Sequence, residues 1–213
     1  MTADFATRLV PGTVVGIDAS AEVIDAARRD HPDVTFSVGD VYDLGVEEAS
    51  WDVVHAHQVL QHLADPVAAL REMRRVVRPG GIVAARDSDY ASFTWHPADE
   101  RLARWLALYH EIARANGGEP DAGRRLLSWA RQAGFTRVEA AASAWCFATP
   151  SEREWWGTLW AERMTTSAIA QQAIREGRAT TEELAAMAGA WRAWAAVDEA
   201  WFAVLHGEVI CTR

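Results

Sequence analysis

The chain contains no lysine. All 21 of its basic side chains are arginines, they stand against 30 acidic ones, and the formal net charge is −9. Without lysine, catalysis through a lysine Schiff base is excluded. An acidic chain that has no basic cluster repels phosphate backbones. We therefore expect no nucleic acid among its partners.

Cysteine and long apolar runs are also scarce. Cys146 and Cys211 are the only cysteines, too few and too far apart for a zinc cluster or a disulfide scaffold, so we expect two small buried side chains. No apolar run approaches the roughly 20 residues of a membrane-spanning helix. Residues 1–5 have neither the basic nor the apolar region of a secretion signal. The sequence therefore predicts a cytoplasmic protein with no membrane partner.

Strand and helix signals alternate through the first two thirds of the chain. Buried strands are expected at four apolar runs, residues 13–17, 34–38, 51–56 and 82–85. Ser20 and Asp65 are expected to cap two of the helices between them, and residues 78–81 to form a turn before the last strand. Short connections between alternating strands and helices predict parallel βαβ units.

The last third of the chain is mostly helical. Its expected elements are helices over about 98–115 and 121–133, a strand over 136–147, a helical stretch over 151–199 and an apolar strand over 201–211. The sequence thus predicts an α/β fold with a Rossmann-like, mostly parallel sheet and an antiparallel closing strand. We expect a core at residues 1–150, a helical insert or lid at 151–199 and the closing strand at 200–213.

Acidic residues follow two consecutive predicted strands. Asp18 ends the first strand and Asp40, preceded by Gly39, follows the second. A carboxylate at such a strand end can accept hydrogen bonds from ribose hydroxyls or from the amino group of adenine, or it can merely cap a turn. Because the ends of neighbouring parallel strands line one crevice, the pair favours an adenosine-containing ligand.

Several motifs in this order resemble those of class I S-adenosylmethionine-dependent methyltransferases, in particular the ubiquinone/menaquinone-biosynthesis group. They are Val15–Ser20, Val38–Val41, Trp51–Val54 with Leu60–Pro66, and Arg78–Gly81. The order and spacing are specific over residues 3–90 and looser beyond. The resemblance implies S-adenosyl-L-methionine as cofactor and a small-molecule methyl acceptor as partner.

The resemblance also assigns residues to the cofactor. They are Asp18, Ala19, Gly39, Asp40, Val41 and His57. By this likeness, Asp18 holds the ribose, Asp40 the adenine amine and Val41 the adenine ring. His57 lies beside the methionine part of the cofactor.

The family has one feature that is absent here. Its members begin with a strand and a loop of the type Asp-x-Gly-x-Gly-x-Gly, whereas residues 3–10 resemble the helix that follows that loop. The strand in question is the central one, between the strands that end at Asp18 and Ala56. Its absence would leave two rows of unpaired backbone groups. We expect an upstream segment outside this sequence to fill the gap, or else a strand of a second copy in a homodimer.

Other polar residues suggest weaker hypotheses. His55, His57 and His62 could together bind zinc, but no carboxylate lies at a ligand-like spacing without another assigned role, so we expect no metal. Methyl transfer needs placement and exclusion of water, and a base helps where the acceptor is a hydroxyl or an amine. The candidates for that base are His62, Asp87, Tyr90 and His206, each of which could equally be structural.

Tryptophans recur one helical turn apart in the helical stretch, at positions 155, 156, 160, 191 and 194. They could form the core of the insert, or an aromatic wall shaped for a flat or apolar acceptor. The function predicted from the sequence is methyl transfer to a small apolar or aromatic acceptor. The alternatives are a nicotinamide-dependent oxidoreductase and a catalytically inactive binding or scaffolding module.

Overall fold

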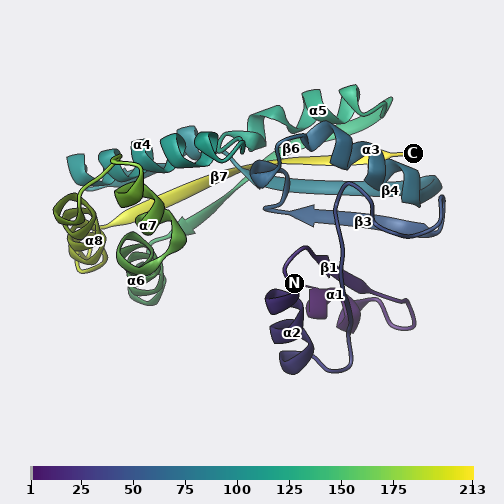
Figure 1. The fold of residues 1–213 in the computed structure, drawn as a ribbon, viewed down its shortest axis with the longest axis horizontal. Helices are drawn as coiled ribbons and strands as arrows, with labels where there is room; N and C mark the ends of the chain where they lie inside the picture. The colour runs from purple at the N-terminus through teal and green to yellow at the C-terminus, as the bar shows by residue number, and fades with distance from the viewer. Residues whose placement is uncertain (1) are drawn as a thin grey trace.

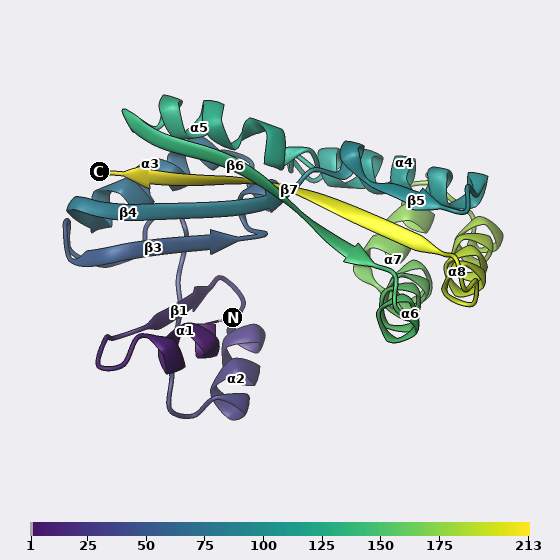
Figure 2. The same cartoon turned by 180° about the vertical axis from the view of Figure 1, so that it is seen from behind.

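The computed structural model describes residues 2–213, which form two separate β-sheets (Figure 1). The smaller sheet pairs β1 (Val15–Asp18) with β2 (Thr35–Val38) in parallel. The larger sheet has the order β3-β4-β7-β5, with β6 also paired to β7. In both views the small sheet and its helices lie beyond β3, on the side away from β4 (Figures 1 and 2).

The smaller sheet belongs to a βαβ unit in which β1 leads through α2 (Ala21–Asp30) to β2. Ser20 caps α2 as predicted, because its Oγ accepts a hydrogen bond from the N–H of Val23 at 3.3 Å. Helix α1 (Thr2–Arg8) precedes β1, and its first residue, Thr2, lies beside Gly16 of that strand. A Cβ atom at Gly16 would lie 2.6 Å from the Phe36 ring and 3.1 Å from Thr2, so only glycine fits between them.

A second parallel unit runs from β3 (Trp51–His57) through η1 (Leu60–His62) and α3 (Pro66–Val76) to β4 (Val77–Ser88). Asp65 caps α3 as predicted, accepting from the N–H of Ala68 at 2.8 Å. Residues 78–81, where a turn was expected, lie within the bounds of β4, but none of them pairs with β3. The register jumps from Trp51–Val77 to Val53–Ile82, and Gly80 between them has a φ of 78°.

Antiparallel strands complete the larger sheet. The closing strand β7 (Trp201–Thr212) lies between β4 and β6 (Arg137–Phe147) and also pairs with the short β5 (Thr94–His96). Helix α5 (Leu126–Gln132) follows η3 (Ala122–Arg125) and covers the same face of the sheet as α3 (Figure 1). The α/β class and the antiparallel closing strand are confirmed.

A cluster of helices surrounds the amino-terminal end of β7. It contains α4 (Glu100–Ala115), α6 (Pro150–Thr166), α7 (Ala168–Arg175) and α8 (Thr181–Ala195), with the short η2 (Tyr90–Ser92) at its edge. The domain bounds predicted from the sequence assign the residues of α4 to the core at residues 1–150. Of the five tryptophans considered above, four are buried and pack in this cluster, whereas Trp155 is 56% exposed. In residues 2–213 no helix combines the length and apolarity needed to cross a membrane.

Candidate functional site

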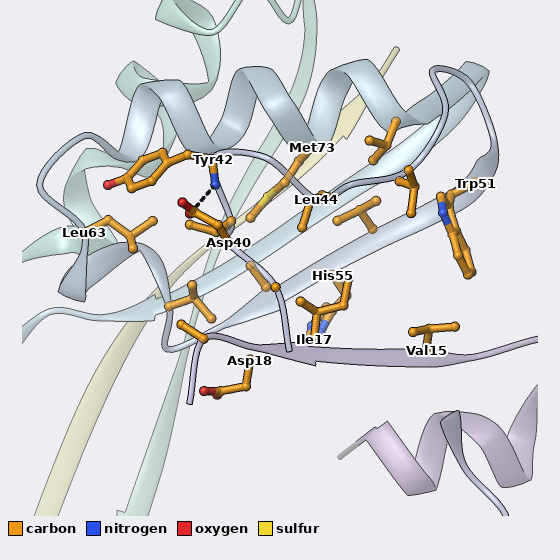
Figure 3. A pocket seen from close by; sticks show the side chains of 18 of the residues that line it. Val15, Ile17, Asp18, Asp40, Tyr42, Leu44, Trp51, His55, Leu63 and Met73 are labelled. Atoms are coloured by element: carbon orange, nitrogen blue, oxygen red, sulfur yellow. Dashed lines mark hydrogen bonds between the residues drawn. The ribbon is translucent and has the colours of Figure 1, made fainter. Parts of the chain in front are cut away.

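A pocket of about 510 Å³ lies between β1 and β3 (Figure 3). At the carboxyl ends of the strands its lining includes Asp18, Ala19, Gly39, Asp40, Val41, Gln58, His62 and Leu63. Towards the amino ends the lining is mainly apolar and includes Val15, Trp51, Val53 and Val76. The pocket therefore has a polar end, where two strands and two loops converge, and an apolar half between two strand edges.

Two exposed carboxylates occupy the polar end. Asp18 accepts a hydrogen bond from the N–H of Ser20 through Oδ1 at 2.8 Å, and Asp40 accepts one from the N–H of Tyr42 in the same way at 2.9 Å. Each bond closes a short turn that fixes the direction of the side chain. Within residues 2–213 neither Oδ2 atom has a hydrogen-bond partner. Both carboxylates therefore keep one oxygen for a ligand.

The loop after β2 is fastened to α3, which gives the pocket a fixed wall. The N–H of Leu44 donates to Oε1 of Glu72 at 2.9 Å, and the N–H of Asp65 donates to the Tyr42 hydroxyl at 3.1 Å. Hydrogen bonds from Arg75 hold the pKa of Glu72 below its usual value, so this buried carboxylate stays charged and keeps the loop in place. Val41, Leu63 and Met73 present apolar surface to the pocket.

Gln58 stands at the end of β3 in a left-handed backbone conformation, with φ of 59°. Its Oε1 accepts from Gln61 Nε2 at 2.7 Å and from Ser88 Oγ at 2.9 Å, and its Nε2 lies 2.9 Å from His206 Nε2. Gln61 Nε2 also lies 3.2 Å from His62 Nε2. A non-glycine residue is rarely held in this conformation unless its surroundings fix it, and such residues concentrate at functional sites.

Burial shifts the pKa of the titratable side chains that lie behind Gln58. Asp87 is fully buried, and loss of water raises its pKa to about 7 although backbone N–H groups of residues 59–61 oppose the rise. Burial, followed by the positive charge of Arg86, lowers the pKa of both His57 and His206 to about 4. Both imidazoles are therefore neutral at pH 7. Burial also lowers the pKa of His62.

The structure separates the predicted site residues into two groups. Of the six predicted cofactor contacts, all but His57 line the pocket, and His55 lines it in place of His57. His57 lies farther along the sheet, 5.7 Å from the Trp145 ring and 6.3 Å from His206. No group of three potential ligands among residues 2–213 is placed to hold a metal ion.

The four candidate bases lie in three different places. His62 lines the pocket, and Asp87 and His206 lie behind it in the network around Gln58. Tyr90 is 7% exposed and stacks on Tyr109 at 4.0 Å, in the helical cluster and away from the pocket. Sequence reasoning missed Gln58, because neither its positive φ nor its bond to a residue 148 positions away leaves a local signal.

Comparison with known proteins places this geometry in a family. Residues 1–85 match a family described as a methyltransferase domain. An uncharacterized methyltransferase of Schizosaccharomyces pombe is 31% identical, over 99% of this chain and 79% of that protein. A trans-aconitate 2-methyltransferase of Methylobacterium radiotolerans is 29% identical, over 82% of this chain and 62% of that protein.

Among solved structures, phosphoethanolamine N-methyltransferase 2 of Haemonchus contortus, in complex with S-adenosylhomocysteine, aligns with a TM-score of 0.58. The identity is 17%, over 99% of this chain and 46% of that one, so this likeness shows a shared fold. The chain belongs to the class I family of S-adenosylmethionine-dependent methyltransferases. The family predicted from the sequence is confirmed.

Proposed function

We propose that this chain transfers the methyl group of S-adenosylmethionine to a small organic acceptor, with the cofactor lying across the carboxyl ends of β1, β2 and β3. One observation carries the proposal. Asp18 and Asp40 follow neighbouring parallel strands, line the same pocket and each keep an oxygen for a ligand. Two such carboxylates suit the ribose hydroxyls and the amino group of an adenosine.

The rest of the polar end fits the same ligand. Val41 and Leu63 offer apolar surface to an adenine ring. A Cβ atom at Gly39 would lie 2.8 Å from Ile17, so glycine at this position leaves the backbone accessible to a ligand. Ala19 lines the pocket beside Asp18. When bound, the cofactor supplies an electrophilic methyl group on a sulfonium centre. The protein then contributes placement of the acceptor in line with that methyl group and exclusion of water.

For the acceptor we propose a small apolar or aromatic molecule that binds beyond the carboxyl end of β3. Trp145 supports this, because it is 39% exposed and its ring lies 4.4 Å from His206 and 5.7 Å from His57. Neutral imidazoles can accept a hydrogen bond from a hydroxyl or an amine. His62 is the candidate base that lines the pocket itself. We propose that His62 contacts the ligand, whereas Asp87 and His206 act through the hydrogen-bond network around Gln58 without touching the ligand.

Calorimetry with S-adenosylhomocysteine tests the proposal. Asp18→Ala and Asp40→Ala should each weaken binding by about 1.5–3 kcal/mol, or about 10- to 150-fold, the range for hydrogen bonds to a charged group. Asp33→Ala is the matched control, because it removes the same charge from an exposed residue outside the pocket. Asp40→Ala should spare an analogue that lacks the adenine amine. Unchanged affinity in both variants, or thermal stabilisation by NAD alone, would overturn the proposal.

A further inference from the structure

Two amide side chains connect His62 at the pocket with the buried His206. Gln61 Nε2 lies 2.7 Å from Gln58 Oε1 and 3.2 Å from His62 Nε2. Gln58 Oε1 also accepts from Ser88 Oγ at 2.9 Å, and Gln58 Nε2 lies 2.9 Å from His206 Nε2. Each of these contacts needs one donor and one acceptor, so the orientation of one amide decides the orientation of the other.

The backbone holds Gln61 in place from both sides. Its N–H donates to Oδ1 of Asp87 at 3.1 Å, and its carbonyl accepts from the N–H of Glu119 at 2.9 Å. A Cβ atom at Gly118 would lie 2.7 Å from the same carbonyl, so the neighbouring loop packs directly on it. The side chain of Gln61 is 5% exposed in total. Gln61 therefore cannot turn to water, and only the orientation of its amide is open to choice.

Two orientations of the amide pair avoid placing two donors or two acceptors against each other. In the first, Gln61 Nε2 donates to Gln58 and to His62, and Gln58 Nε2 donates to His206. In the second, both amides are turned over, and both imidazoles must donate. The second orientation places the NH₂ group of Gln61 where its Oε1 now lies, at a buried position with no partner among the described residues.

The buried position beside Gln61 favours the first orientation. A buried carbonyl oxygen without a partner is tolerated more often than a buried N–H group without one, and an NH₂ group has two. The Nδ1 atom of His206 has no hydrogen-bond partner within residues 2–213 in either orientation. The backbone of Val204, however, raises the pKa of this ring and so partly offsets the effect of burial, as a carbonyl close to a ring N–H does.

The first orientation fixes the tautomer of both imidazoles. A neutral imidazole that accepts a hydrogen bond at Nε2 carries its proton on Nδ1. The Nδ1 atom of His62 has no hydrogen-bond partner within residues 2–213, and His62 is an exposed residue that lines the pocket. The ring therefore has an N–H group for a ligand, whereas the lone pair of its Nε2 is already used by Gln61.

We propose that Gln58 and Gln61 are positioning residues that hold His62 and His206 as Nδ1–H tautomers, so that His62 offers the pocket a hydrogen-bond donor. The base role that the place of His62 suggests then falls away. His62 lines the same pocket as Asp18 and Asp40. The atom that meets its N–H is therefore a hydrogen-bond acceptor of the cofactor, an oxygen or a ring nitrogen; this last step rests on the proposed function.

Nuclear magnetic resonance tests the tautomers without any cofactor, so the result does not depend on the proposed function. Long-range proton–nitrogen correlation spectra of the chain labelled with nitrogen-15 histidine show which ring nitrogen carries the proton. At pH 7, His62 and His206 should each carry it on Nδ1. His96, an exposed residue whose ring has no hydrogen bond within residues 2–213, is the control and should show a mixture of both tautomers.

Two variants test the role of the amides. Gln61→Leu removes the donor to His62 and should give that ring the mixed spectrum of His96, and Gln58→Leu should do the same for His206. A proton on Nε2 of either ring in the parent chain would overturn the proposal. An unchanged His62 spectrum in Gln61→Leu would also contradict it. If a variant does not fold, the spectrum of the parent chain still decides between the two tautomers.

Calorimetry with S-adenosylhomocysteine tests the donor role towards the ligand. His62→Phe removes the ring N–H and should weaken binding by about 10-fold. His62→Asn places an amide nitrogen near the position of Nδ1 and should restore most of that loss, whereas it cannot act as a base. Equal losses in the two variants, or no loss in either, would contradict the donor role. If the parent chain itself does not bind S-adenosylhomocysteine, the proposed function fails, while the tautomer result stands or falls by itself.

Discussion

Asp87 is a carboxyl group that the fold keeps away from water, and its titration should be visible in the stability of the whole protein. It is fully buried at the end of β4, its Oδ1 accepts from the N–H of Gln61 at 3.1 Å, and its Oδ2 has no partner among the described residues. Burial raises its pKa from 3.8 to about 7. It is therefore protonated in the folded state over a pH range in which it is ionised in the unfolded state.

The sign and size of the effect follow from this difference. A group whose pKa is raised on folding contributes stability that is present below the unfolded pKa and is lost as pH rises to the folded pKa. Between pH 5 and pH 7 the loss is about 1.4 kcal/mol per pH unit, or on the order of 2–3 kcal/mol in all. Asp87→Asn keeps an oxygen that accepts from Gln61 and cannot ionise. The variant should therefore gain stability relative to the parent chain as pH rises from 5 to 8.

Urea unfolding at pH 5 and pH 8 measures this difference. Any cost of the added amide group is the same at both pH values, so it cancels in the comparison. Asp33→Asn, at an exposed position, is the control and should change the two free energies of unfolding equally. If Asp87→Asn and the parent chain lose stability in parallel between these pH values, Asp87 is already ionised in the folded protein and our reasoning about its burial is refuted.

Two further predictions concern the helical cluster and the network behind the pocket. Trp191→Ala should cost about 3–5 kcal/mol in urea unfolding, because the fully buried ring packs 4.8 Å from Trp105; the exposed Trp155→Ala should cost less than about 1 kcal/mol, and equal losses would contradict this picture. Folding lowers the pKa of His206 from 6.5 to about 4, so its contribution to stability is present above pH 6.5 and lost as pH falls towards 4. His206→Gln should make the acid loss shallower while its side-chain oxygen, near the position of Nε2, can still accept from Gln58, and an unchanged acid profile from pH 7 to pH 4 would show that His206 does not titrate as described.

Local sequence patterns determined the elements that rest on neighbouring residues. Ser20 and Asp65 cap their helices because the N–H groups they satisfy lie three residues ahead. The positions of Asp18 and Asp40 at the rim of one pocket followed from parallel strand order, since the carboxyl ends of neighbouring parallel strands must meet. These inferences needed no knowledge of long-range contacts.

Other features depend on residues that are distant along the chain, and the tertiary structure alone decided them. Residues 78–81 look like a turn locally, but the pairing of Val77 with Trp51 places them inside β4, as an irregularity that has no partner on β3. Tyr90 is a candidate base by its position in the sequence, but the structure buries it in the helical cluster, where it stacks on Tyr109.

Gln58 shows the physical reason for this limit. Its left-handed backbone is unfavourable in isolation for a residue with a side chain, and no neighbour in sequence demands it. Contacts with Ser88 and His206 hold the side chain. Ser88 reaches it because β4 pairs with β3, and His206 reaches it because β7 pairs with β4. The sequence by itself determined the helix caps, the strands β1, β2 and β3, and the carboxylates that follow β1 and β2. The network behind those carboxylates exists only once strands distant in sequence have paired.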